Sequence, residues 1–230
     1  MIDIHCHILP GIDDGADRLQ TSLTMATIAA LDGITTIIAT PHTDGITVNQ
    51  SVVQQAVDRL NGELVNRNID LEVVAGYEIP ADLVCDLQSH TIADTPYILV
   101  EFPHQYLPED AAETLYTLVQ TGKKPIIAHP ERNGSVLRNP ELLRDLIAVG
   151  AMIQLTAASV TGDFGPDILN CANYLLRNQL VHFLATDSHS PTFRKPVLTP
   201  ARKAAARLIG REQADRLVVD NPRAILTETV

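Results

Sequence analysis

Short apolar runs alternate with stretches of helical periodicity along the whole chain. The apolar runs are rich in β-branched residues and end abruptly at polar ones, which is typical of buried strands. Between them, apolar residues recur every three or four positions, as in helices with one buried face. Strands are expected over residues 2–7, 34–40, 71–75, 98–101, 125–128, 151–155 and 182–185. Helices are expected over residues 21–31, 53–64, 111–119, 142–147 and 168–176, and through much of 200–230.

This alternation predicts the fold class. It makes about seven β/α pairs, and strands that alternate with helices usually lie parallel in one sheet. We therefore expect an α/β fold, a parallel β/α barrel. No internal repeat, low-complexity tract or linker interrupts residues 1–230, so we expect a single domain. Asn139 is expected to cap the helix at 142–147, with Pro140 at its first position.

The composition is that of an ordinary globular protein with an excess of acidic residues. The 230 residues are 45% apolar and 20% charged, and the formal net charge is −11. This charge argues against a nucleic-acid-binding surface, which normally carries a basic patch. The three cysteines are widely spaced, which suits a reducing compartment, and no apolar run reaches the roughly 20 residues of a membrane span. Met1 is followed so closely by a ligand-type residue that we expect no cleaved signal and a cytoplasmic location.

Residues of the types that bind metals stand where the apolar runs end. These residues are His5, His7, His42, Glu78, Glu101, His129, Asp187 and His189. Side chains of a strand alternate between faces, so His5 and His7 share one face, as do Asp187 and His189. The carboxyl ends of parallel strands converge on one rim of a barrel. The pattern therefore predicts a metal site at that rim.

The other three histidines have a plainer interpretation. His90 and His104 fall in loop-like segments and are expected to face solvent. His182 begins its strand, which would place it at the opposite rim. A carboxylate after an apolar run can also be merely the first solvated residue, which fits Glu78 or Glu101 taken alone. Converging imidazoles make both carboxylates better candidates for ligands.

A turn after the first strand adds a pair of aspartates. Residues 10–15 read Pro-Gly-Ile-Asp-Asp-Gly, a composition typical of turns. One of Asp13 and Asp14 could cap the following helix while the other reaches a metal, and their spacing leaves both assignments open. With one aspartate the candidates number nine. Because one zinc site uses three or four protein ligands, this number implies two or three ions.

The donor types favour particular metals and an anionic substrate. Imidazole and carboxylate without thiolate suit Mn²⁺, Fe²⁺ or Zn²⁺. Three divalent ions would outweigh four carboxylates and attract anions, phosphate above all. Arg132 and Arg194 closely follow two of the candidate histidines, and a guanidinium group matches two phosphate oxygens. Either arginine alone would usually be a solvated loop residue.

A cysteine-based phosphatase can be rejected on the sequence. Cys171 and Arg177 have the Cys-x5-Arg spacing of that class. The five residues between them contain no glycine and continue a helical pattern, so their N–H groups are not free to cradle a phosphate.

Several motifs together resemble a known family. Residues 3–16 read Asp-Ile-His-Cys-His-Ile-Leu-Pro-Gly-Ile-Asp-Asp-Gly-Ala, and the later motifs are Thr40-Pro41-His42, Gly76-Tyr77-Glu78-Ile79, Ala128-His129-Pro130-Glu131-Arg132 and Thr186-Asp187-Ser188-His189. They resemble the polymerase-and-histidinol-phosphatase (PHP) superfamily. Within it they are most similar to the bacterial metal-dependent tyrosine phosphatases of the CpsB/YwqE type. The likeness spans nearly the whole chain.

The resemblance implies a distorted (β/α)7 barrel of the PHP type, with its metal site at the C-terminal rim of the strands. It implies a trinuclear, usually manganese-dependent centre that hydrolyses phosphotyrosine on a bacterial tyrosine kinase controlling capsule or exopolysaccharide synthesis. By matching motifs it favours Asp14 over Asp13 and assigns binding of the substrate phosphate to Arg132 and Arg194. The implied metal ligands are His5, His7, Asp14, His42, Glu78, Glu101, His129, Asp187 and His189.

Two positions depart from the family's pattern. Cys6 stands where such proteins commonly carry serine, and Thr156 stands where they often carry asparagine. The Cys6 side chain is expected to point away from the metal face. Thr156 could change the shape of the substrate rim, which leaves the preference for particular peptides open.

The hypothesis that follows is hydrolysis of a phosphomonoester by metal-activated water, without a covalent enzyme intermediate. A PHP phosphatase of a small metabolite such as histidinol phosphate is the main alternative. A nuclease or proofreading role is disfavoured by the net acidity. A non-catalytic kinase-binding module is the least favoured, because the complete set of candidate ligands is present.

Overall fold

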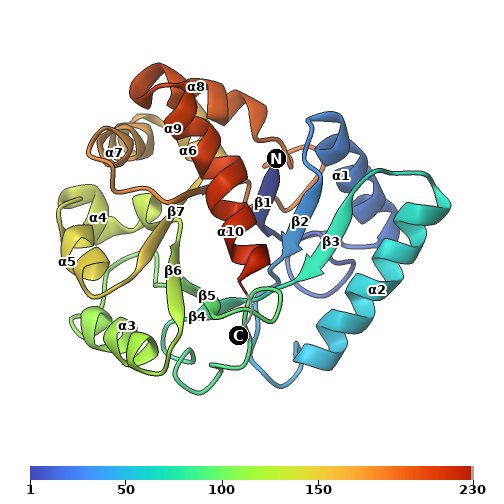
Figure 1. Ribbon diagram of the computed structural model, residues 1–230, viewed down its shortest axis with the longest axis horizontal. Helices are drawn as coiled ribbons and strands as arrows, with labels where there is room; N and C mark the ends of the chain where they lie inside the picture. The colour runs from blue at the N-terminus through green and yellow to red at the C-terminus, as the bar shows by residue number, and fades with distance from the viewer. Residues whose placement is uncertain (229–230) are drawn as a thin grey trace.

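Short parallel strands form the centre of the molecule, and helices cover them from outside (Figure 1). The computed structural model describes residues 1–228. Every strand in this part of the chain pairs in parallel with its neighbours. The strands are β1 (Ile2–Cys6), β2 (Thr36–Ala39), β3 (Glu72–Ala75), β4 (Glu78–Pro80), β5 (Tyr97–Glu101), β6 (Lys124–Ala128), β7 (Met152–Thr156) and β8 (Phe183–Ala185). The predicted parallel α/β fold is confirmed.

The helices follow the strands in sequence. The first five are α1 (Leu19–Leu31), α2 (Gln50–Asn66), α3 (Ala111–Gln120), α4 (Gly134–Arg138) and α5 (Leu142–Ala148). The later ones are α6 (Ala157–Thr161), α7 (Pro166–Arg177), α8 (Thr199–Ile209), α9 (Arg211–Asp215) and α10 (Asn221–Thr227). A 3-10 turn, η1 (Pro130–Arg132), follows β6, and a π-helical turn, η2 (Arg216–Asp220), joins α9 to α10. Within residues 1–228, no helix is both long and apolar enough to cross a membrane.

Two sheets meet at two seams to make the barrel. One has the strand order β1-β2-β3 and the other β4-β5-β6-β7-β8. A backbone bridge between Cys6 and Ser188 joins β1 to the chain after β8, and a bridge between His42 and Glu78 joins the chain after β2 to β4. β3 and β4 follow each other almost directly, the first paired with β2 and the second with β5. Counted as one interrupted strand, they leave seven strand positions around the barrel, as the sequence predicts.

Gly76 stands at the interruption between β3 and β4. A Cβ atom at this position would lie 2.6 Å from Cγ2 of Ile38 in β2. Real Cβ atoms do not approach so closely, so glycine lets the chain run this close to the end of β2 before it pairs with β5. The segment after Gly76 places Glu78 at the carboxyl end of the barrel, beside His42.

A β-bulge in β1 changes which residues face the barrel interior. Asp3 pairs with Ile37 and Cys6 with Ala39, so β1 has one residue more than β2 between the same two rungs. Before the bulge, Ile2 and Ile4 point into the barrel, and after it, His5 and His7 do. Cys6 instead packs on the outer side with the helices. The extra residue therefore turns an apolar face into a histidine face within one strand.

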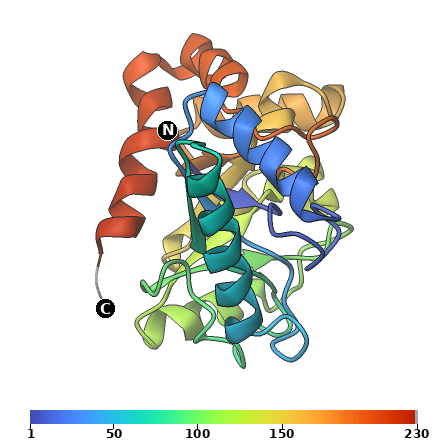
Figure 2. The same ribbon diagram turned by 90° about the vertical axis from the view of Figure 1, so that its right-hand side faces the viewer.

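The barrel interior is filled by a small apolar cluster separate from the main core between strands and helices. Its members are Ile2, Ile4, Ile38, Ile92, Tyr97, Leu99, Ile126, Ala128, Phe183, Ala185 and Ile225. Ile225 comes from α10, which lies across the barrel in Figure 1; Figure 2 shows this helix continuing the C-terminal layer in red. α10 therefore closes the amino ends of the strands, and the carboxyl ends are left for the site.

Three local expectations need correction. The helix expected to begin at Pro140 begins at Leu142, and Glu141 rather than Asn139 precedes it. Asn139 instead accepts a hydrogen bond from the Glu141 N–H at 3.3 Å and closes the turn before the helix. The short helices α4 and α6 were not expected, because single-turn helices carry no periodic signal and depend on tertiary contacts.

Candidate metal centre

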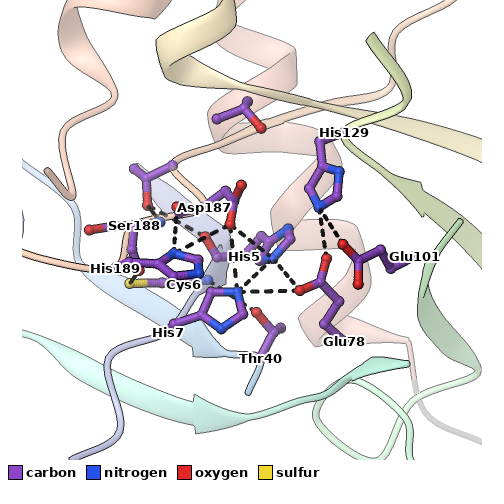
Figure 3. A network of polar contacts seen from close by, with 12 residues as sticks. His5, Cys6, His7, Thr40, Glu78, Glu101, His129, Asp187, Ser188 and His189 are labelled. Carbon is purple, nitrogen blue, oxygen red and sulfur yellow. Dashed lines mark hydrogen bonds and ion pairs between the residues drawn. The ribbon is translucent and has the colours of Figure 1, made fainter. Parts of the chain in front are cut away.

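The candidate ligands come from the carboxyl ends of the strands and the loops that follow them. Figure 3 shows His5, His7, Glu78, Glu101, His129, Asp187 and His189. His5 is the next-to-last residue of β1, and Glu101 is the last residue of β5. Glu78 is the first residue of β4. Because β3 and β4 together form one interrupted strand, Glu78 lies near the carboxyl end of that strand. The loops that follow β1, β2, β6 and β8 carry His7, Asp14, His42, His129, Asp187 and His189. Residues 184 positions apart in the sequence thus meet at one rim.

The structure brings all nine candidates into overlapping groups. In each group, one donor atom per residue lies within 4.8 Å of every other. Among residues 1–228 these groups are His7–Asp14–His42–His189, His5–His7–Asp187, His5–Glu78–His129, Glu101–His104–His129 and His42–Glu78–Glu101. The shared members make the groups one continuous cluster.

Glu78 lies at the centre of the cluster and is completely buried. Its Oε1 lies 2.9 Å from Nε2 of His129, and its Oε2 lies 3.3 Å from Nε2 of both His5 and His7. Oε2 has no hydrogen-bond partner within the described residues. A buried carboxylate oxygen with that surrounding is a strong candidate for a cation ligand.

Asp13 and Gln154 fix the orientation of the two central imidazoles. Nδ1 of His7 lies 2.6 Å from Oδ2 of Asp13, and Nδ1 of His5 lies 2.9 Å from Oε1 of Gln154. Because both partners are acceptors, each ring in its neutral form carries its proton on Nδ1 and directs a lone pair from Nε2 into the cluster. The two Nε2 atoms lie 3.1 Å apart. Lone pairs at this separation repel each other unless a cation lies beside them.

Asp13 and Asp14 have different surroundings. Asp13 also accepts hydrogen bonds from the backbone N–H groups of Gly15 and His42, so its carboxylate is fully engaged. Asp14 is largely exposed, and its Oδ1 lies 3.4 Å from Nε2 of His189 and 3.7 Å from Nε2 of His42. Asp13 thus positions histidine, and Asp14 has the free oxygen that a ligand needs.

The electrostatics of the cluster differ between its carboxylates. Burial raises the pKa of Glu101 to about 7, and the neighbouring Glu78 charge adds to the effect. Burial alone would raise the pKa of Glu78 too, but His5 and His129 hold that pKa well below its usual range. Burial lowers the pKa of His129 to about 4, so this imidazole is neutral at physiological pH. A neutral His129 beside an ionised Glu78 is a pair of protonation states that binds metals.

Asp187 joins the histidines to the two candidate arginines. Its Oδ1 lies 3.5 Å from Nε2 of both His5 and His7. Its Oδ2 accepts a hydrogen bond from Nη1 of Arg132 at 2.8 Å and pairs with Nη2 of Arg194. Within residues 1–228, the buried Nε atoms of both arginines have no hydrogen-bond partner. Both arginines therefore have an N–H group that is left without an acceptor beside the cluster.

The backbone is strained at the same place. His129, Asp187 and Arg194 have φ angles of 33°, 49° and 55°, in the left-handed region that non-glycine residues rarely adopt. Strain of this kind persists only where surrounding contacts impose it, and it gathers at functional sites.

The sequence interpretation missed two residues at the site. His104, expected to face solvent, is half exposed, but its Nε2 lies 3.7 Å from Oε1 of Glu101 and 3.5 Å from Nη2 of Arg132. Its position three residues after Glu101 was a signal that could have found it. Gln154 gave no signal, because an amide inside an apolar strand does not show which side chain it meets.

Two further histidines lie away from the cluster. His90 was expected in solvent, which is wrong, because its side chain is buried edge-on against the ring of Tyr77 at 4.9 Å between centroids. His182 precedes β8, at the amino end of the strand, and its Nδ1 accepts a hydrogen bond from the Ile153 N–H at 3.0 Å.

Cys171 lies in the middle of helix α7 and is buried. Burial raises the pKa of its thiol to about 12, so it is not a nucleophile at neutral pH. This environment agrees with the rejection of a cysteine-based mechanism.

Two cavities flank the cluster. One, of about 480 Å³, includes Thr186 and Arg194 in its lining, and the other, of about 640 Å³, includes Glu101 and His104. The rim is therefore open on both sides.

The sequence matches a known family over almost its whole length. The family described as capsular polysaccharide synthesis, CpsB/CapC, matches residues 1–227. The tyrosine-protein phosphatase YwqE of Bacillus subtilis is 43% identical over 197 residues, which cover 83% of this chain and 78% of the relative. The tyrosine-protein phosphatase CpsB of Streptococcus agalactiae is 29% identical over 245 residues, which cover 98% of both chains.

Solved structures agree with the sequence comparisons. A crystal structure from work on YwqE of Bacillus subtilis and CpsB of Streptococcus pneumoniae, described as unique metal-dependent tyrosine phosphatases, has a TM-score of 0.93 at 38% identity. The match covers 100% of this chain and 96% of that one. Histidinol phosphate phosphatase from Lactococcus lactis, covered to 94%, has a TM-score of 0.59 at 14% identity, a likeness of fold alone.

Proposed function

The chain belongs to the CpsB/CapC family of capsular polysaccharide synthesis, and from this membership and the cluster at the barrel rim we propose that it acts as a metal-dependent tyrosine-protein phosphatase. The reaction is hydrolysis of the phosphomonoester of tyrosine. The arrangement of His5 and His7 at the centre of the cluster is the observation that carries the proposal.

Four acceptor atoms of the cluster face one another. Nε2 of His5 and Nε2 of His7 lie 3.1 Å apart, and Oε2 of Glu78 and Oδ1 of Asp187 lie within 3.5 Å of both. The Nδ1 atoms of both imidazoles are engaged with Gln154 and Asp13, so neither Nε2 carries the proton when the ring is neutral. A divalent cation stabilises such an arrangement, and the residues therefore fit the metal that the family implies.

We propose the nine candidates as the metal ligands. The set is His5, His7, Asp14, His42, Glu78, Glu101, His129, Asp187 and His189. Nine donors are enough for two or three ions, since one site of this kind takes about three or four protein ligands. Mixed imidazole and carboxylate donors without thiolate suit Mn²⁺, Fe²⁺ and Zn²⁺ alike. We propose Mn²⁺ as the native metal because the resemblance to the family implies it.

Arg132 and Arg194 are proposed to bind the phosphoryl group. Both guanidinium groups already lie against Asp187 and keep a buried, unpartnered Nε within the described part of the chain. Two planar guanidinium groups can take up charge that develops on the equatorial oxygens during transfer. Asp187 holds both in place, because its Oδ2 is their common acceptor.

Metal ions held by the proposed ligands would supply an activated water molecule and Lewis-acid stabilisation of the phosphoryl oxygens. The side chains of the protein orient the ligands and bind the substrate. Asp13 and Gln154 hold His7 and His5 in the tautomer that faces the centre. The leaving group is a phenolate with a pKa of about 10, which needs less protonation than an alkoxide does. The side chains therefore act mainly by positioning and by charge.

The physiological substrate is proposed to be phosphotyrosine on a bacterial tyrosine kinase that regulates capsule or exopolysaccharide synthesis. Membership of a capsular polysaccharide family supports this partner. The open rim between two cavities supports a substrate on the surface of a protein, because a peptide needs room on both sides of its side chain.

The first test is the rate of hydrolysis of a phosphotyrosine peptide by metal-stripped protein titrated with Mn²⁺. We expect activity to return with Mn²⁺ in the wild type and to fall at least about 100-fold in His5→Ala, because the variant loses a central ligand. His182→Asn is the matched control, since this histidine lies at the other end of β8. A folded, metal-loaded wild type without turnover of any phosphomonoester would contradict the proposed function.

A further inference from the structure

The cavity beside Arg194 has an aromatic lining. Phe164 and Phe193 both face it, together with Thr186 and Arg194. The chain has four phenylalanines and no tryptophan, so two of its few large aromatic side chains meet next to the candidate phosphate-binding residues. The cavity lies between α6, the loop after it, and the loop from β8 to α8; Figure 1 places α6 beside α8.

Phe193 is held out toward solvent by its own loop. The residue is 68% exposed, although burying a phenyl ring is normally favourable. Oγ of Ser190 accepts a hydrogen bond from the Phe193 N–H at 3.0 Å, and the next residue is Arg194, with its φ of 55°. The loop thus fixes the backbone of two consecutive residues, one with a phenyl ring and one with a guanidinium group.

Phe164 lies on the same side of the site. The guanidinium carbon of Arg132 lies 5.6 Å from the centroid of the Phe164 ring, a cation–π contact. Each arginine is therefore accompanied by a phenylalanine, one through space and one along the chain. A phosphomonoester held by both arginines would present its leaving group to these rings.

The cavity on the other side of the cluster has a different chemistry. Asp82, Glu101 and Asp110 are part of its lining, along with His104 and the exposed Tyr106. Its carboxylates repel a dianionic phosphomonoester, whereas the first cavity has Arg194 and Lys195 against one carboxylate, Asp163, and attracts a phosphomonoester. Charge therefore favours the cavity beside Arg194 for the substrate side chain.

We propose that the cavity beside Arg194 receives the phenyl ring of phosphotyrosine, and that Phe193 is the residue that favours aryl over alkyl phosphate there. This inference rests on the proposed function, because it names the place of the substrate's ring at the same site. Aromatic contacts contribute beyond simple burial, and a ring between Phe164 and Phe193 would gain them, whereas a serine side chain would not.

Two competitive inhibitors separate ring binding from phosphate binding. Phenylphosphonate and methylphosphonate carry the same charged group, and only the first has a ring. We expect Phe193→Ala to raise the inhibition constant of phenylphosphonate by about threefold to tenfold and to leave that of methylphosphonate unchanged. Phe193→Tyr, which keeps a ring, should retain the wild-type selectivity. Tyr106→Ala, in the opposite cavity, is the matched control and should change neither constant.

The outcomes distinguish this inference from the function on which it rests. The inference fails if the wild type hydrolyses phosphotyrosine and Phe193→Ala weakens both phosphonates equally, since the loop would then act only through Arg194. It also fails if Tyr106→Ala alone weakens phenylphosphonate, which would place the ring in the other cavity. A wild type that neither hydrolyses phosphotyrosine nor binds either phosphonate would overturn the proposed function and this inference with it.

Discussion

The chemistry of the site depends on how individual side chains are oriented. His5 and His7 are candidate ligands by residue type, but Gln154 and Asp13 decide which nitrogen of each ring faces the cluster. Neither partner could be assigned from spacing. Gln154 is an amide inside an apolar strand, and Asp13 stands beside Asp14 with equal claim to a metal. Acceptors that orient metal-binding histidines are usually remote in sequence, so they become visible only in three dimensions.

His182 gives a pH prediction at the same scale. Burial lowers the pKa of this histidine, so the unfolded chain, with a pKa of about 6.5, binds the proton more readily than the folded one. Stability should therefore fall as the pH drops below about 6.5, because protonation favours the unfolded state. His182→Asn removes the titration and can keep an acceptor for the Ile153 N–H.

The measurement is urea unfolding of both metal-stripped proteins between pH 7.5 and pH 5. The other histidines titrate in both and cancel in the difference. We expect the wild type to lose stability relative to the variant as the pH falls, and a constant difference across this range would refute the prediction.

Two irregularities of the strands place the ligands. The bulge in β1 brings His5 and His7 to the interior face that Ile2 and Ile4 occupy earlier in the strand. The break at Gly76 ends the pairing with β2 and carries Glu78 to the rim. Strand periodicity correctly put His5 and His7 on one face, but it could not show the bulge. A single inserted residue leaves no mark in an apolar run and is seen only against the partner strand.

Gly76→Ala tests the element scale. The new methyl group would lie 2.6 Å from Ile38 and push the chain between β3 and β4 away from β2. We expect a loss of about 1–3 kcal/mol in the free energy of unfolding, typical of overpacking, and weaker Mn²⁺ binding because Glu78 shifts. Gly62→Ala is the matched control. Gly62 lies within α2 with nothing within 4 Å of an added Cβ, so this change should stabilise by about 0.5–1 kcal/mol.

Both free energies come from urea unfolding of the metal-stripped proteins, and metal binding from calorimetry. Equal stability of Gly76→Ala and the wild type would contradict the prediction, because it would show that position 76 tolerates a side chain.

The molecule as a whole is acidic, and it carries a cluster of candidate metal ligands at one end of its barrel. The net charge is −11, and the cluster joins four candidate carboxylates to five histidines. α10 closes the amino ends of the strands through Ile225, so the carboxyl ends remain open to ligands. Because the candidate ligands come from residues between 5 and 189, bound metals would tie together most of the chain.

Metal removal should therefore destabilise the entire fold. A ligand at about 100 times its dissociation constant stabilises by roughly 2.7 kcal/mol, which for a protein of this size corresponds to about 5–10 °C in Tm. We expect Mn²⁺ to raise the Tm of the stripped wild type by this amount and to have a much smaller effect on His5→Ala. Thermal unfolding followed by circular dichroism measures it. An identical Tm with and without Mn²⁺ would argue against a metal centre at the rim.

The sequence by itself determined the class of fold, the place of the site and the donor types. Alternating periodicities fixed the order of strands and helices, and ligand-type residues at the ends of apolar runs fixed the carboxyl rim, because both signals are local and repeat along the chain. The family motifs supplied the expected activity, and the comparisons bear it out.

Only the tertiary structure decided how these residues meet. It showed that Asp13 contacts His7, that Gln154 contacts His5, and that both arginines contact Asp187. It also showed that His104 lies at the site and that His90 is buried. It also set Phe164 and Phe193 beside the arginines. These contacts join residues far apart in sequence. Their geometry depends on the bulge in β1, the interruption at Gly76 and loop backbones in unusual conformations. None of these changes the pattern of apolar and polar positions.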